Sequence, residues 1–432
     1  MKRILGLGSA IAIPIGIAIG SGIFRTPGKV AEALGSAPLV LGAWAIGGLV
    51  YVLAALVLAE LATRLPRAGG EFAYLREAYG DFPAFFFGWA YTIVIAGAGI
   101  AGVAVVFGEY VASLAGLDAG ASSGPIGASA VALLVGVNAL GLKTGSRLQN
   151  ALTIAKVLIL AGVVAVGFAA GDGAGFAEAG EPPSSILVGL ALAFQAVFWT
   201  FDGSNDVVKM AEEVKDPARA LPRVLFATVA TLTLLYVGVN AAILFVMTPA
   251  ALKDSIEPVA GVASHAFGAG GAALVTAATA VVLLGAVNAN LVANPRVTFA
   301  LARARMAPRA LSALSAKQTP IGALLLVGTL AVLFLLTKTF TQILAIYTFA
   351  GLILWGLAYS TVFVLRTRDV RSETAVYLSP LFPVAPLVLV LTHAALAAGI
   401  AVSSPREALD SAALLAAGGA LFLLWRRSTR PK

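Results

Sequence analysis

The stretch "AIGSGIFRTPG" (residues 18–28) interrupts the first long apolar segment of the chain. The segment spans residues 4–23, which at about 1.5 Å per residue is enough to cross the roughly 30 Å hydrocarbon core of a bilayer. A membrane helix should be continuous there, yet Gly20 and Gly22 flank the polar Ser21 near its end. Because glycine weakens a helix, we expect a broken spanning helix at this point.

The composition is that of a polytopic membrane protein. Hydrophobic residues make up 59% of the 432 residues and charged residues only 12%, whereas a soluble domain carries about a quarter charged residues. Apolar segments separated by short polar loops predict an all-α membrane protein with about 12 transmembrane helices. They cover residues 4–34, 39–61, 82–114, 126–142, 148–169, 186–210, 224–247, 272–301, 321–336, 343–365, 378–402 and 408–424.

The net charge of +8 follows a topological pattern and does not indicate a nucleic-acid partner, because basic residues gather in cytoplasmic loops of membrane proteins. If the amino terminus is cytoplasmic, the loops on that side hold most of the basic residues. The pattern predicts an integral protein of the plasma (inner) membrane with both termini cytoplasmic. The loop residues concerned include Arg64, Arg67, Arg76, Lys215, Arg219, Arg223, Arg303, Arg305, Arg309, Arg366, Arg368 and Arg371.

A second break interrupts the sixth span, at "FWTFDGSNDVVKMAEEV" (residues 198–214). Spans one and six lie five spans apart, so two five-span halves would cross the membrane in opposite directions and form an inverted repeat. We expect one transporter domain over residues 1–432, with repeats at 1–170 and 184–366 and two further helices at 378–425.

Paired breaks of this kind indicate a binding site for a small molecule. Close helix packing is the alternative reason for the glycines, and Gly16 with Gly20 does form a small-xxx-small pair. Breaks at corresponding positions of two halves favour a transporter site instead. Unwound backbone exposes carbonyls at one helix end and N–H groups at the next, which suits the ammonium and the carboxylate of a zwitterion.

At these residues the sequence resembles the amino acid, polyamine and organocation transporters, and within them the bacterial relatives of the L-type amino acid transporters. The resemblance rests on "GSGIFRTPG", "AELATRLPRAGGEFAYLREAYG", "FDGSNDVVKMAEEVKDPARALPR" and "NPRVTFALARARMAPRALS". It implies the ten-helix inverted repeat with broken helices 1 and 6, plus two C-terminal helices, and amino acid transport by alternating access.

The resemblance also implies site residues. It places the substrate carboxylate at the N–H groups of Ser21 and Gly22, and the α-ammonium near the carbonyls of Ala18, Trp199 and Asp202. Trp199 would cover the substrate, its alternative being an interfacial tryptophan. Ser204 stands where many L-type relatives have a tryptophan, so the resemblance does not predict the width or polarity of the pocket for the substrate side chain. The other expected substrate-binding residues are Ile19, Gly20, Ile23, Phe201, Gly203, Thr92 and Asn288.

Lys156 lies about nine residues beyond the cytoplasmic end of span five, or roughly 13 Å deep. Its stem could return the ammonium to the surface, but an ionisable residue at that depth points to function. The resemblance implies that its ammonium replaces the sodium ion of coupled relatives.

Four further polar residues have two interpretations each. Asp202 either caps the broken helix or faces the substrate and favours a cationic side chain. Thr92 and Asn288 either line the pocket or bridge two helices. Arg296 either pairs with an acidic residue, as we expect, or contacts the substrate.

Several other classes of protein are disfavoured. "GASSG" (residues 120–124) matches a serine-hydrolase pattern but lacks its strand-turn-helix context. The chain has no cysteine and two histidines, so we expect neither a metal site nor a cofactor. We also expect that the protein is not an enzyme.

The sequence therefore predicts a sodium-independent secondary transporter of L-amino acids, an exchanger or facilitator that favours neutral side chains. Proton coupling and a cationic amino acid or polyamine substrate remain alternatives, ahead of a channel or a substrate-sensing receptor. The partners are the amino acid substrate and the lipid bilayer, and a partner subunit is left open.

Overall fold

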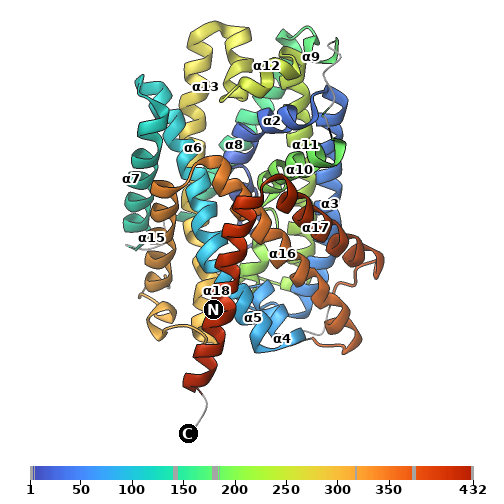
Figure 1. The fold of residues 1–432 in the computed structure, drawn as a ribbon, viewed down its shortest axis with the longest axis vertical. Coiled ribbons are helices and arrows are strands. Elements are labelled where there is room, and N and C mark those ends of the chain that lie inside the picture. The colour runs from blue at the N-terminus through green and yellow to red at the C-terminus, as the bar shows by residue number, and fades with distance from the viewer. Residues whose placement is uncertain are drawn as a thin grey trace.

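The computed structural model describes residues 3, 5–139, 145–177, 183, 185–316, 319–371 and 376–429, which form a bundle of long helices (Figure 1). Predicted boundaries at residues 1, 4, 142, 184 and 432 lie outside the described residues. Within them, the one extended pairing is an isolated bridge between Leu5 and Val214. The all-α prediction is confirmed.

The long helices match the predicted spans. In the described part of the chain nine helices are long and apolar enough to cross a membrane, and the bent pair α1 and α2 would make ten. Because α15 has only 17 residues and α18 is not among these ten, the count of twelve stays a prediction. The elements that make up the predicted spans are α1 (Leu7–Ala18), α2 (Ser21–Leu34), α3 (Ala37–Arg64), α5 (Asp81–Ala90), η1 (Tyr91–Ala96), α6 (Gly97–Ala115), α7 (Ala119–Ala139), α8 (Gly145–Ala170), α10 (Ile186–Phe201), η2 (Asp206–Glu213), α11 (Pro217–Val246), α13 (Pro258–Ala293), α14 (Pro295–Arg303), α15 (Ile321–Thr337), α16 (Phe340–Thr367), α17 (Val384–Ser403) and α18 (Pro405–Thr429).

Three predicted spans begin elsewhere than expected. The fourth begins at Ala119 instead of residue 126, and the seventh at Pro217 instead of residue 224. The element α13 contains two helices joined at a kink at Gly268, whose φ is 67°, so the part after the kink begins close to the predicted residue 272. The eleventh span begins at Val384 instead of residue 378, because Pro380 and Pro383 interrupt the apolar stretch before it.

Short helices distinguish the two ends of the bundle. In Figure 1, α9 (Ala174–Ala177) and α12 (Pro249–Asp254) lie at the top, and α4 (Glu71–Tyr79) lies at the bottom. We call these ends the α12 face and the α4 face. A last short element, η3 (Arg309–Ser312), precedes α15.

Small residues bring the helices together, while leucines cover the outside. A Cβ at Gly47 of α3 would lie 2.3 Å from Val197 Cγ1 of α10, so these helices approach more closely than a larger residue allows. Leu187, Leu234 and Leu274 are each more than 70% exposed. Apolar side chains so exposed along spanning helices fit contact with lipid.

Candidate functional site

The predicted break in span one is present. Helix α1 ends at Ala18, α2 begins at Ser21, and the two are bent by 42°. Gly20 precedes α2 without a side chain that could cap it. The first N–H groups of α2, from Ser21 to Ile23, therefore have no partner within the helix and are available to a ligand with acceptor oxygens.

The break in span six packs directly against this one. After α10 ends at Phe201, Gly203 takes a φ of 86°, and the chain continues as the 3₁₀ helix η2. A Cβ at Gly203 would lie 2.4 Å from Ile17 Cγ2. Both the backbone conformation and the close approach to α1 therefore require glycine here.

A small cavity of about 30 Å³ lies between the two breaks, with room for roughly one or two water molecules. Six predicted site residues line it: Ala18, Gly20, Ser21, Gly22, Trp199 and Asp202. Five lining residues were missed by the sequence reasoning: Ile17, Gly99, Val103, Asn290 and Tyr347.

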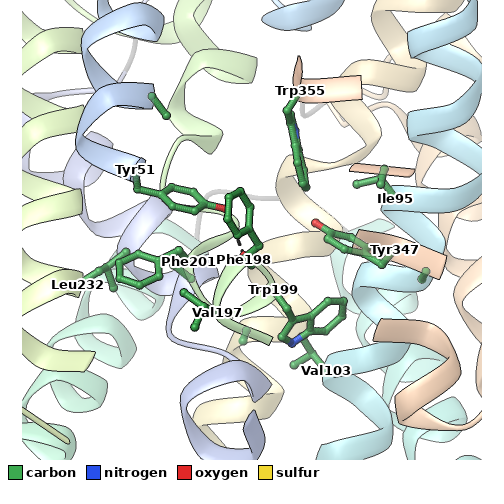
Figure 2. Close-up of a cluster of buried hydrophobic side chains, with 14 of the residues drawn as sticks. Tyr51, Ile95, Val103, Val197, Phe198, Trp199, Phe201, Leu232, Tyr347 and Trp355 are labelled. Carbon is green, nitrogen blue, oxygen red and sulfur yellow. Dashed lines mark hydrogen bonds between the residues drawn. The ribbon is translucent and has the colours of Figure 1, made fainter. Parts of the chain in front are cut away.

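Four lining side chains form two pairs through polar contacts. Trp199 Nε1 donates to Ser21 Oγ at 3.2 Å, which connects α10 to α2. The Tyr347 hydroxyl of α16 donates to Asp202 Oδ2. The rings of Trp199 and Tyr347 also meet edge to face, with centroids 4.7 Å apart, and Figure 2 draws them near Val103. Asp202 thus carries a carboxylate that lines the cavity with one oxygen engaged by Tyr347.

On the α12 side the cavity is covered by aromatic and charged side chains. Trp199 packs edge to face against Phe340, with ring centroids 6.0 Å apart. The Arg25 guanidinium lies 5.9 Å from the centre of the Phe340 ring, and its Nε is 3.3 Å from Glu109 Oε2. These contacts join α2, α6, α10 and α16 above the cavity.

The structure does not bring Thr92 and Asn288 to the cavity, and both follow the second interpretation, that of a polar residue bridging two helices. Thr92 Oγ1 bonds to Thr298 at 2.9 Å, and Asn288 Oδ1 accepts from Asn138 at 2.7 Å. Each joins two helices, because a polar group away from water needs a partner. The remaining predicted residues flank the cavity without lining it: Ile19, Ile23, Phe201, Gly203 and Ser204.

Lys156 is fully buried and reaches the carboxyl end of α1. Its Nζ donates to Gly16 O at 2.8 Å and to Ile19 O at 3.0 Å. The ammonium therefore lies on backbone carbonyls, and its side chain does not return to the surface.

Tyr236 of α11 was missed and changes one expectation. Its hydroxyl donates to Ala18 O at 2.8 Å, and the same oxygen accepts Gly20 N–H at 2.8 Å. A carbonyl oxygen has two lone pairs, so the Ala18 carbonyl is already saturated and is a poor site for the substrate ammonium. A buried tyrosine hydroxyl needs a partner, so the sequence could have marked Tyr236 and Tyr347 as buried polar residues without naming the groups that they contact.

An apolar cluster closes the cavity toward the α4 face. Ile17, Met210, Ala289 and Ala293 form a buried group separate from the main core, which we call the inner plug. Beyond it, Arg296 pairs with Glu213, with Nε 2.7 Å from Oε1. This ion pair confirms the prediction for Arg296 and ties η2 to α14.

Glu71 at the start of α4 should make the stability of the fold depend on pH. Burial raises the pKa of its carboxyl to about 7, with the Lys209 ammonium partly offsetting the effect. A raised pKa means that the folded chain holds this proton more tightly than the unfolded chain, so the contribution to stability is complete below pH 4.5 and is lost as pH rises through 7.

We therefore expect the midpoint of thermal unfolding in detergent to fall between pH 5 and pH 8. The corresponding loss of unfolding free energy is on the order of 3 kcal/mol. Glu71→Gln should flatten this dependence, and an equally steep profile in the variant would assign it to another group.

Comparison with known proteins decides the family. The sequence pattern described as "Amino acid permease" matches residues 5–422. This chain belongs to the amino acid permease family. The permease is 31% identical to the serine/threonine exchanger SteT of Bacillus subtilis over 394 residues, which covers 90% of this chain and 89% of the relative.

Two mammalian relatives are similarly distant. The b(0,+)-type amino acid transporter 1 of Mus musculus is 30% identical over 94% of the permease and 84% of its own length. The Asc-type amino acid transporter 1 of Mus musculus is 30% identical over 90% and 75%. The predicted resemblance is confirmed, and the permease is an integral membrane transporter of amino acids, not an enzyme.

Proposed function

We propose that the permease is a sodium-independent exchanger of small neutral L-amino acids that works by alternating access. The observation that carries this proposal is the cavity between the two breaks, with the uncapped start of α2 on one side and Asp202 and Tyr347 on the other. The carboxylate of the substrate would bind the N–H groups of Ser21 and Gly22. Its ammonium would lie toward Asp202 and the end of α10.

The size of the cavity favours small side chains. Trp199 packs tightly against α6, because a Cβ at Gly102 would lie only 2.3 Å from Trp199 Cη2. Trp199 and Tyr347 both line the cavity, so a larger substrate requires a larger displacement of these two side chains. The name of one relative, a serine/threonine exchanger, supports the same class.

The orientation and the internal repeat belong to this proposal. The α4 face would be cytoplasmic, with both termini on that side, and residues 1–170 and 184–366 would form the inverted repeat. The polar cover formed by Arg25 and Glu109 would then lie on the outside.

Uptake of labelled amino acids into liposomes that contain the purified protein tests the proposal. We expect serine, alanine and threonine to be taken up at least about tenfold faster when the liposomes contain unlabelled substrate, because an exchanger needs a load to return. An uptake rate that is the same with and without internal substrate would indicate a facilitator.

Competition by arginine and lysine tests substrate charge. The carboxylate of Asp202 is already engaged by Tyr347, so we expect cationic amino acids to compete less well than serine or alanine. If they compete better, and Asp202→Asn removes their advantage, the permease carries cationic substrates.

A further inference from the structure

Two irregular helix segments meet at the side chain of Lys209, which is 2% exposed, and Tyr91 links them to the α13–α14 junction. Lys209 belongs to the 3₁₀ helix η2, and its Nζ lies 2.5 Å from Asp206 Oδ1 on the same element. It also donates to the hydroxyl of Tyr91, the first residue of the π-helix η1, at 2.6 Å. Tyr91 in turn donates to Asn294, at the junction of α13 and α14, at 2.9 Å.

The hydrogen bonds continue from this junction to the cavity. Asn294 Nδ2 donates to Asn290 Oδ1 at 3.2 Å, and Asn290 lines the cavity. On the opposite side, the Lys209 carbonyl accepts the N–H of Gly69 in the loop before α4 at 3.0 Å. A buried series of polar contacts therefore connects the cavity wall to the α4 face.

The same segments build the inner plug. Met210 follows Lys209 along η2, while Ala289 and Ala293 each precede one of the two asparagines along α13. Opening the cavity toward the α4 face requires Met210 to separate from Ala289 and Ala293. That separation pulls η2 away from α13 and strains the contacts centred on Lys209.

We propose that Lys209 is the positioning residue of the gate on the α4 face, holding η2, η1 and the α13–α14 junction together while the inner plug is closed. Asn290 connects these contacts to the substrate cavity, because it accepts a hydrogen bond from Asn294 and lines the cavity. The inference rests on the proposed function in one respect, namely that the gate opens to release an amino acid.

The contacts of Lys209 with Asp206 and Tyr91 suit a gate, because such contacts can break and reform during transport. A buried ion pair gains little net stability over apolar packing because both charges lose their water. It is nevertheless directional, since an ammonium has three donors to place, and here they meet partners on two elements. Irregular helix segments are also frequent at hinges and functional sites.

Cysteine accessibility tests the proposal, because the natural sequence contains no cysteine. Ala289→Cys places a single reporter in the inner plug of the full chain. The rate of its modification by a membrane-impermeant methanethiosulfonate is measured in inside-out vesicles and in intact cells. Asp206→Asn with Lys209→Gln removes both charges together, so that no uncompensated charge stays buried.

We expect the double variant to accelerate modification at least about tenfold from the α4 face, through a shift toward the open state. Modification from the other face should not accelerate. The matched control is Glu60→Gln with Arg64→Gln, which removes a buried pair of α3, with Arg64 Nη2 2.9 Å from Glu60 Oε1, whose further hydrogen bonds reach Arg366, Val370 and Ser379. Gel filtration checks that each variant is folded.

Two results would overturn the proposal: an unchanged rate in a folded Lys209 variant, or equal acceleration in the α3 control. Labelling does not depend on which amino acid is carried. A failure of exchange in the parent protein would therefore reject the proposed function and leave the gate measurable.

Discussion

Lys156→Met is expected to reduce exchange at least about a hundredfold, because two charge-assisted hydrogen bonds to α1 are lost together. The ammonium donates to the carbonyls of Gly16 and Ile19 at the end of α1. Carbonyls at an open helix end carry partial negative charge, and leaving them unpaired in a buried site is costly. The break beside the cavity should then lose its geometry.

Thr153→Val is the matched control for this variant. Thr153 lies one turn earlier on the same helix, and its hydroxyl donates to Ala12 O of α1 at 3.0 Å. Losing this single neutral bond should cost no more than about fivefold. If both variants lose activity equally, α8 supports α1 mechanically and the charge of Lys156 has no special role.

A fixed ammonium also predicts the ion dependence of transport. Exchange by the unmodified protein should be equal in sodium and in choline media and indifferent to an imposed proton gradient. Sodium-stimulated uptake would contradict the sodium-surrogate role. Accumulation driven by an inward proton gradient would mean that Lys156 gives up its proton during the cycle.

Gly22→Ala is expected to reduce substrate affinity about tenfold or more, since overpacking of a tight contact costs roughly 1–3 kcal/mol. Glycine at this position lets the backbone approach the substrate carboxylate. The structure adds a second reason: a Cβ at Gly22 would lie 2.6 Å from Thr200 Cα, a backbone atom that cannot rotate aside. The extra methyl must push α2 away from α10.

Binding measured with the purified variant checks this result, with Gly42→Ala as the control. Gly42 lies in α3, and a Cβ there would meet nothing within 4 Å, so its affinity should be unchanged. Affinity near that of the parent in Gly22→Ala would reject the break as the place where substrate binds.

The breaks could be predicted because glycine next to polar residues is conspicuous in an apolar span. Gly20, Ser21 and Gly22, and later Asp202 with Gly203, revealed where backbone would unwind. The rotation of an unbroken helix was harder to predict. Asn288 and Asn290 lie two residues apart, roughly 200° around the helix, so only one of them can face the cavity, and the structure selects Asn290.

Residues from distant segments could not be assigned for a related reason. Tyr347 and Tyr236 reach the site from α16 and α11 only because those helices pack beside the breaks. A local pattern states that a tyrosine is buried, but not which of several neighbouring helices holds its partner.

Aromatic rings behind the cavity bind three helices into one body. Tyr51 of α3 stacks on Phe201 of α10, with centroids 5.2 Å apart, and Phe201 meets Tyr236 of α11 edge to face at 5.0 Å. Figure 2 shows Tyr51, Phe198 and Phe201 gathered on the side of α10 away from Val103. Interlocked rings resist sliding because cores are closely packed. Helix α10 is therefore expected to move together with α3 and α11. Because α10 has 16 residues against 28 in α3 and 30 in α11, a small rotation beside the cavity would produce a larger displacement at the ends of those two helices.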